Sequence, residues 1–250
     1  MAADAAGDLS GRVVVVTGAS RGIGRAAALA VAAAGGHVVA VARTQGALEE
    51  LDDAIRALGG SATLVPMDLK EYEAIDRLGA AIHGRWGRLD GVIGNAGVLG
   101  DLMPLGHVEP KAWDTVMSVN VTANWRLIRS LDPLLKESDA GRAVFVSSGA
   151  AHKCTAYWGP YSVSKAALEA LVRIYAAETA TTPIRVTLVN PGPLRTAMRR
   201  AAMPGEDPET LRTPDDLAPH LARLVSPGWD RTGVIYDFPT DRILTPQPPA

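Results

Sequence analysis

Short apolar runs of strand length alternate with longer helical segments along this chain. The runs are rich in β-branched residues and carry few charges, which is typical of strands that are buried on both faces of a sheet. They lie at residues 13–17, 37–41, 62–66, 91–94, 143–147 and 185–190. Alanine- and leucine-rich segments that favour helix lie at residues 22–34, 45–58, 70–86, 110–136, 159–179 and 214–224. The alternation predicts an α/β fold, a doubly wound parallel sheet with helices on both faces.

In a Rossmann fold of this kind the ligand binds at the carboxyl ends of the strands. The length of 250 residues suits one large unit, so we expect residues 1–250 to form a single domain. Two segments fall outside the alternation. Residues 196–213 are rich in Met, Arg and Pro and long for a connection, which predicts a lid over the substrate. The proline-rich tail at 245–250 is either disordered or docked on a neighbouring subunit.

Charge and cysteine content narrow the partners of the protein. Lys and Arg number 25 against 27 Asp and Glu, and the net charge of −2 offers no basic surface to nucleic acid or anionic lipid. We therefore expect neither nucleic acid nor a membrane as partner. Cys154 is the single cysteine, which excludes an intrachain disulfide, and residues 1–12 lack the apolar core of a signal peptide. We expect a cytoplasmic protein, and without a His/Cys cluster at metal-ligand spacing we expect no metal.

A glycine-rich turn follows the first predicted strand directly. It reads Thr17-Gly-Ala-Ser-Arg-Gly-Ile-Gly24 and leads into a helix. Glycine permits a tight turn and close backbone approach, so a pyrophosphate can bind against the free N–H groups of the helix N-terminus. The turn predicts a dinucleotide site built from Gly18, Ser20, Arg21, Gly22, Ile23 and Gly24.

The end of the second predicted strand indicates which dinucleotide binds. A fold selective for NAD places an acidic residue there, on the ribose 2′-hydroxyl. This chain has Ala42 followed by Arg43, and a planar guanidinium matches a phosphate group. With Arg21 in the glycine turn, Arg43 therefore favours NADP over NAD. Asp68 and Leu69 end the third predicted strand, where Asp68 caps the next helix or contacts the adenine edge.

Tyr161 and Lys165 stand four residues apart on a predicted helix, so their side chains lie one turn apart on the same face. A free phenol has a pKa of about 10, and a neighbouring ammonium lowers it by favouring the phenolate. The pair therefore predicts a tyrosine that acts as acid and base. This spacing is common by chance, and its weight comes from the residues that accompany it.

Taken in order, these residues resemble the short-chain dehydrogenase/reductase family over nearly the whole chain. The matching pattern is Thr17-Gly-x-x-x-Gly-x-Gly24, Asp68, Asn95-Ala-Gly97, Asn120, Ser148, Tyr161-x-x-x-Lys165 and Pro191-Gly192. Within the family, the segments at 89–92, 138–141, 157–161 and 195–198 look most like the YciK-type branch of oxidoreductases.

The resemblance implies a role for each of four side chains. Tyr161 would be the general acid in carbonyl reduction and the base in alcohol oxidation. Lys165 would lower the pKa of Tyr161, together with the positive nicotinamide ring, and would hydrogen-bond the nicotinamide ribose. Ser148 would hold the substrate oxygen. Asn120 would position a water that links Lys165 to solvent.

The resemblance extends to the rest of the cofactor site. Asn95, Ala96 and Gly97 would line the cofactor, while Pro191, Gly192 and Thr196 would meet the nicotinamide amide and present its 4-pro-S face. The chain departs from the family at Gly94, where many members have an asparagine that braces the sheet. We expect this change to affect stability more than chemistry.

The expected activity is NADP-dependent interconversion of a carbonyl and an alcohol. A non-catalytic NADP(H)-binding sensor and a cofactor-recycling dehydratase or epimerase remain alternatives. The expected partner is a small carbonyl or alcohol substrate, which would face Leu99, Ala150, His152, Trp158, Pro193 and Met198. By analogy with the family, the helical segments at 110–136 and 159–179 would pair across a twofold axis, so we expect a homodimer or homotetramer.

Overall fold

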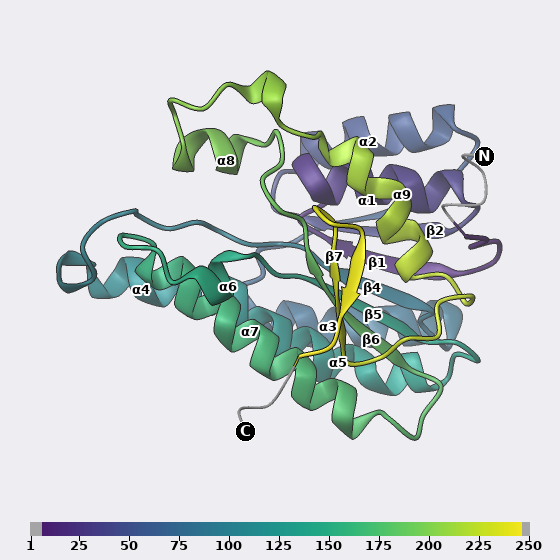
Figure 1. Cartoon of the computed structure of the whole chain (residues 1–250). Helices are drawn as coiled ribbons and strands as arrows, with labels where there is room; N and C mark the ends of the chain where they lie inside the picture. Colours follow the sequence, from purple (N-terminus) through teal and green to yellow (C-terminus); the bar gives the residue numbers. More distant parts are fainter. Residues whose placement is uncertain (1–6, 247–250) are drawn as a thin grey trace.

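A single sheet runs through residues 7–246, the part of the chain that the computed structural model describes (Figure 1). Its strand order is β3-β2-β1-β4-β5-β6-β7-β8. The strands are β1 Val13–Thr17, β2 His37–Ala42, β3 Ser61–Pro66, β4 Gly91–Gly94, β5 Arg142–Val146, β6 Arg185–Asn190, β7 Val234–Asp237 and β8 Arg242–Leu244. Neighbours from β3 to β7 are parallel, and β8 is antiparallel to β7. The predicted doubly wound sheet is confirmed, with one antiparallel edge strand added.

The direction of winding reverses between β1 and β4. The chain first builds β1, β2 and β3 outward in one direction, then returns to place β4 beside β1 and builds the other half. The two connections diverge at this point and leave a crevice at the carboxyl ends of the strands, where ligands bind in folds of this type.

Two helical layers cover the sheet. The helices are α1 Gly22–Ala33, α2 Gln45–Ala57, α3 Tyr72–Trp86, α4 Pro110–Met117, α5 Ala123–Lys136, α6 Ala150–Lys153, α7 Gly159–Glu178, α8 Ala197–Ala202 and α9 Pro214–Leu224. Helices α1, α2 and α9 lie on one face, and α3, α5 and α7 lie on the other (Figure 1).

The apolar strands form the core from both of their faces. Along β1, Val14 and Val16 pack into the cluster under α1 and α9, while Val13 and Val15 pack into the cluster under α5 and α7. These four side chains are at most 5% exposed, and burial of each contributes about 1.5–3 kcal/mol. Because successive side chains point to opposite faces, burial of both faces requires a continuous apolar run.

The structure corrects the sequence prediction in three places. The predicted helix at 110–136 contains a π-helical turn, Ser118–Thr122, between α4 and α5. Strands β7 and β8 were not predicted; β7 is a buried strand of four residues, and the three residues of β8 are all exposed. The short helices α6 and α8 lie in segments that the sequence suggested were irregular. Most of the predicted tail, at 247–250, lies outside the described residues.

Within residues 7–246, no helix combines the length and the apolar character that crossing a membrane requires.

Gly94 at the end of β4 is part of a packed group with Phe145 and Asn124. It pairs with Phe145 on β5, and a Cβ atom at position 94 would overlap the Phe145 ring and lie 2.9 Å from Asn124 Oδ1. The Asn124 amide in turn donates to the backbone carbonyl of Asn120 at 2.9 Å, inside the π-helical turn. The missing family asparagine thus makes room for a different amide, which binds the π-helical turn.

Gly94→Asn is therefore expected to destabilise this protein, although it restores the residue that many relatives carry. Overpacking of a filled site costs about 1–3 kcal/mol in the free energy of unfolding. Thermal and urea unfolding of the variant would measure the loss. Gly84→Ala in α3 is the matched control, because its Cβ meets no atom within 4 Å. That variant should be at least as stable as the parent, and an equally stable Gly94→Asn protein would contradict the packing described here.

Candidate active site

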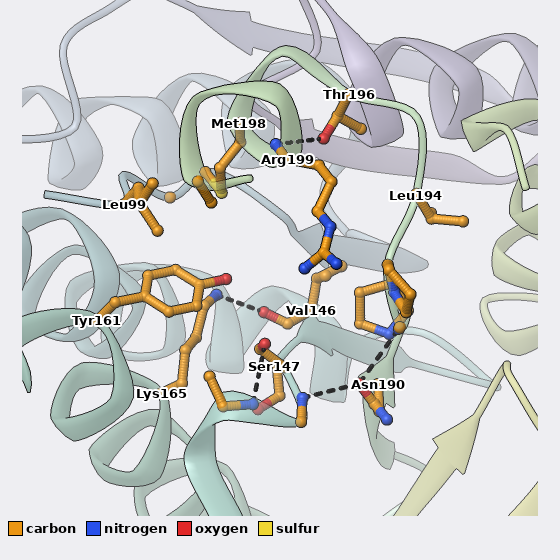
Figure 2. A pocket seen from close by; sticks show the side chains of 18 of the residues that line it. Leu99, Val146, Ser147, Tyr161, Lys165, Asn190, Leu194, Thr196, Met198 and Arg199 are labelled. Atoms are coloured by element: carbon orange, nitrogen blue, oxygen red, sulfur yellow. Dashed lines mark hydrogen bonds between the residues drawn. The ribbon is translucent and has the colours of Figure 1, made fainter. Parts of the chain in front are cut away.

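A cavity of about 670 Å³ opens at the carboxyl ends of β4, β5 and β6, between α7 and α8 (Figure 2). Its walls are largely apolar. They include Ile23, Leu99, Val146, Ala150, Trp158, Pro193, Leu194, Met198, Ala202, Met203 and Pro239. The polar groups that face it come mostly from residues that follow strand ends and from the first turns of α7. The cavity therefore lies at the crevice that the sheet topology predicts.

Tyr161 and Lys165 enter this cavity from α7. Both are nearly buried, with 8% of Tyr161 and 4% of Lys165 exposed. The Lys165 ammonium lies 5.8 Å from the centre of the Tyr161 ring and donates to the backbone oxygen of Val146 at 2.7 Å. The last residue of β5 thus fixes the lysine beside the tyrosine (Figure 2).

Ser148 follows β5 by two residues, and its hydroxyl lies close enough to the Tyr161 phenol to lower the pKa of that group. Its hydroxyl also accepts the N–H of Ala150 at 3.2 Å, which holds the serine at the start of α6. The hydroxyl groups of Ser148 and Tyr161 therefore both face one apolar cavity. A substrate oxygen placed there would find two hydrogen-bond donors, one of which can also give up its proton.

The pKa values of the pair shift in opposite directions. Burial raises the pKa of Tyr161, and the nearby Ser148 hydroxyl opposes this only in part. Burial lowers the pKa of Lys165 to about 8, although the nearby Glu169 carboxylate acts to raise it. The sequence predicted that Lys165 lowers the pKa of Tyr161, whereas the pKa is raised. The cost of desolvating the phenolate outweighs the effect of the neighbouring groups of this chain. The phenol is thereby held in its acid form.

Asn120 is fully buried in the π-helical turn. Its side chain accepts from Val98 N–H at 2.8 Å and donates to the Val98 carbonyl and the Ser164 hydroxyl, each at 2.9 Å. The amide thus ties the segment after β4 to α7. Beside it, a Cβ on Gly97 would lie 3.3 Å from Asn120 Oδ1 and 3.6 Å from Lys165 Nζ, so Gly97 keeps space open between these two groups.

The glycine turn has the shape that a bound phosphate needs. Gly18 has φ of +66°, and a Cβ on Gly24 would overlap the Gly18 carbonyl. Helix α1 follows, and its N-cap residue Arg21 makes no side-chain capping hydrogen bond. The first N–H groups of α1 are therefore available to an anion.

Asn95 braces this turn from β4. Its side chain donates to the Thr17 carbonyl at 2.9 Å, and the Thr17 hydroxyl accepts the N–H groups of Asn95 and Ala96, each at 3.0 Å. The expected cofactor contact at Asn95 is thus combined with a structural role, because Asn95 also lines the cavity.

The residues predicted at the adenosine end lie around the ends of β2 and β3. Arg43 and Arg21 are both exposed, and Ala42 is buried. Asp68 accepts the N–H of Lys70 at 3.0 Å, so its carboxylate caps the turn that leads to α3. Leu69 is buried in the core beneath this turn. The two arginines thus flank this region with free side chains, and the structure favours the capping role for Asp68.

The segment after β6 shapes the nicotinamide end of the predicted site. Pro191, Gly192 and Thr196 all line the cavity. Thr196 caps α8, since its hydroxyl accepts the N–H of Arg199 at 3.1 Å. The sequence missed Asn190, whose Oδ1 accepts from Gly149 at 2.9 Å and Gly192 at 3.2 Å. The sequence signal that could have identified Asn190 is a polar residue at the end of a buried strand, directly before Pro-Gly.

Five of the six residues predicted to face the substrate line the cavity, namely Leu99, Ala150, Trp158, Pro193 and Met198. The exception is His152. Its ring pairs at 2.8 Å with the buried Glu169 of α7, and the Glu169 carboxylate also accepts the Ser147 hydroxyl at 2.5 Å. Glu169 was missed, although its position four residues after Lys165 places it on the same buried face. Lys153, Asp237 and Pro239 also line the cavity without having been predicted.

Comparison with known proteins places this arrangement in a family. The family model for short chain dehydrogenases matches residues 12–207. The Escherichia coli K12 oxidoreductase YciK is 40% identical, over 92% of both chains.

Two crystal structures extend the likeness to three dimensions. A short chain dehydrogenase from Shigella flexneri 2a in complex with NADP has a TM-score of 0.88 and 39% identity, covering 92% of this chain and 97% of that one. Another from Escherichia coli CFT073, in complex with NADPH, has a TM-score of 0.86 and 39% identity, with the same coverage. Fold, site and sequence agree, and the chain belongs to the short-chain dehydrogenase/reductase family of oxidoreductases.

Proposed function

We propose that this protein is an NADP-dependent oxidoreductase that interconverts a carbonyl and an alcohol, with Tyr161 as general acid and base. The observation that carries the proposal is the buried Tyr161 phenol, which lines an apolar cavity at the carboxyl ends of the strands together with Ser148 and the adjacent Lys165. The related enzymes with NADP and NADPH in their crystal structures support the choice of cofactor.

The residues present fit a dinucleotide phosphate. The uncapped N-terminus of α1 offers N–H groups to the pyrophosphate, and a Cβ atom would fill the glycine turn at position 24. Exposed guanidinium groups of Arg21 and Arg43 would hold the 2′-phosphate. NADPH would supply the hydride, and the chain supplies placement and electrostatics.

In reduction, Ser148 and Tyr161 hold the substrate oxygen, and the phenol donates its proton as the oxygen gains charge. The raised pKa of Tyr161 keeps the phenol protonated until that moment. Lys165, fixed by Val146, is placed to hydrogen-bond the nicotinamide ribose and to stabilise the phenolate that forms.

Proton return is proposed to pass through a water positioned by Asn120. The space beside Gly97, within contact distance of both Asn120 Oδ1 and Lys165 Nζ, supports this role. Residues 196–213 are proposed to be the substrate lid, because Met198, Arg199, Ala202 and Met203 of this segment line the cavity opposite Tyr161.

Tyr161→Phe is expected to reduce turnover strongly while NADPH still binds. Loss of a general acid lowers kcat/KM by about 10²–10⁴-fold. A panel of aldehydes, ketones and quinones, followed by NADPH absorbance, would identify accepted substrates and measure the loss, and NADPH fluorescence would follow binding. Tyr157→Phe is the matched control, since Tyr157 is 60% exposed and lies outside the cavity.

The same panel separates the alternatives. Tight NADPH binding without oxidation of the cofactor by any carbonyl would support a non-catalytic sensor. Product formation without stoichiometric NADPH consumption would support a dehydratase or epimerase that recycles its cofactor. Undiminished turnover by Tyr161→Phe would remove the tyrosine from the mechanism.

Arg43→Asp is expected to weaken NADPH binding by about tenfold or more, because it removes a charge-assisted contact with the 2′-phosphate and adds repulsion. NADH binding, measured by the same fluorescence titration, should change much less. Arg77→Asp on α3 serves as control, since Arg77 is exposed on the opposite helical layer. Equal losses for both cofactors would show that Arg43 does not contact the phosphate.

We also propose that the chain forms a homodimer or homotetramer through α5 and α7. Large apolar side chains remain exposed there, including Trp125 at 46%, Val163 at 42% and Ile174 at 57%. Val163 and Ile174 are three helical turns apart and so share one side of α7.

Sedimentation at micromolar concentration is expected to give a mass of two or four chains, and Ile174→Asp should shift it toward the monomer by placing a charge in the interface. A parent protein that sediments near 26.2 kDa would contradict the assembly.

A further inference from the structure

The cavity carries an unusual charge for its apolar walls. Three cationic side chains line it, Lys153, Lys165 and Arg199. Among the described residues that line the cavity, one is acidic, Asp237. Its carboxylate already accepts hydrogen bonds from the side chains of Asn190 and Thr240. Lys165 is committed to Val146 and the reacting centre. The other two cations are Lys153 at the end of α6 and Arg199 on α8, in the lid segment.

The guanidinium of Arg199 is fixed in place by an ion pair with Glu206. It extends from α8 into the cavity, across from Tyr161 and Lys165 (Figure 2). Glu206 binds it side-on, with Nε to Oε2 and Nη2 to Oε1 both at 2.6 Å. Glu206 is absent from the cavity lining, so it holds the guanidinium from outside. Within residues 7–246, Nη1 makes no hydrogen bond.

The segment that carries Arg199 is itself closed at its base. Leu194 pairs with Arg212 in a β-bridge, and Arg195 N–H donates to the Arg212 carbonyl at 2.9 Å. Arg195 also donates to the Pro208 carbonyl at 2.9 Å. Residues 196–213 thus form a loop pinned at its base by these contacts and across its middle by the Arg199–Glu206 pair. A side chain held in this way loses little conformational freedom when it binds a ligand.

We infer that Arg199 is a substrate-binding residue that recognises a carboxylate on the carbonyl substrate. The inference rests on the proposed function and names its substrate class, an apolar carbonyl compound with an anionic group remote from the reacting carbon. The apolar walls take the body of the molecule, Tyr161 and Ser148 take its carbonyl, and Arg199 takes its carboxylate from the lid side. Glu206 is the positioning residue, and its own carboxylate shows that the guanidinium accepts this geometry.

A pair of matched probes tests the inference directly. 4-Formylbenzoate and its methyl ester carry the same aldehyde and ring and differ in the negative charge. The parent enzyme with NADPH is expected to prefer the carboxylate in kcat/KM. Arg199→Gln should lower the carboxylate-to-ester ratio by about tenfold, the scale of one lost charge-assisted contact. Glu206→Gln, which keeps an acceptor but removes the competing charge, should raise the ratio.

Arg200→Gln is the matched control, because Arg200 is exposed on the same short helix and does not line the cavity. It should leave the ratio unchanged. Equal loss of both probes in Arg199→Gln and Glu206→Gln would assign the pair to holding the lid and would overturn the inference. The same conclusion would follow if Arg200→Gln lowered the ratio as much as Arg199→Gln.

Binding without turnover separates this inference from the proposed function. Trp158 lines the cavity, so tryptophan fluorescence can report the titration of benzoate against methyl benzoate. If neither aldehyde is reduced but benzoate binds the parent protein more tightly than Arg199→Gln, the carboxylate site stands and the proposed activity fails. If the ester is reduced and benzoate binds both proteins equally, the activity stands and the carboxylate site is refuted.

Discussion

Burial of the sheet on both faces is the constraint on which the rest of this molecule depends. A strand covered by helices on both sides is largely apolar along its length, so polar groups gather where the strand ends. Thr17, Asn95, Ser147, Asn190 and Asp237 all stand at or just beyond such ends. Their hydrogen bonds join the loops to one another, and the loops in turn carry the reacting groups. The buried core therefore determines where the site lies, because the parallel strands bring their polar ends to one edge of the sheet.

Much of the fold could be predicted because this constraint leaves a clear pattern in the sequence. Six strands and the main helices follow from apolar runs and their spacing, with ends misplaced by only one or two residues. The prediction fails for elements whose local sequence does not show the burial or the helix type that the structure has. Strand β8 is exposed and has no apolar run, while the π-helical turn at Ser118–Thr122 has the same composition as an ordinary helix. The cavity wall at Asp237 and Pro239 was missed because Asp237 ends, and Pro239 follows, the unpredicted strand β7.

The candidate site divides in a similar way. Spacing places Tyr161 and Lys165 on one face of a helix, and the strand end places Ser148 beside them. The side chains that pair with the site residues were harder to predict. His152 precedes α7 in the sequence and looked available to substrate, yet it pairs with Glu169 of α7 and does not line the cavity. The direction of the Tyr161 pKa depends on how completely the phenol is desolvated, and residue spacing carries no measure of desolvation.

The packed group of Gly94, Asn124 and Phe145 has a consequence for how this family varies. The three residues share one volume, and the Asn124 amide fills part of it while binding the carbonyl of Asn120. A change at one position therefore alters what the other two can be, and their effects on stability should not add. Relatives with asparagine at the position of Gly94 are expected to carry a smaller residue opposite it, so the three positions should covary as a unit. Exchanging one of these residues alone between members of the family would therefore leave it packed against two residues that do not fit it.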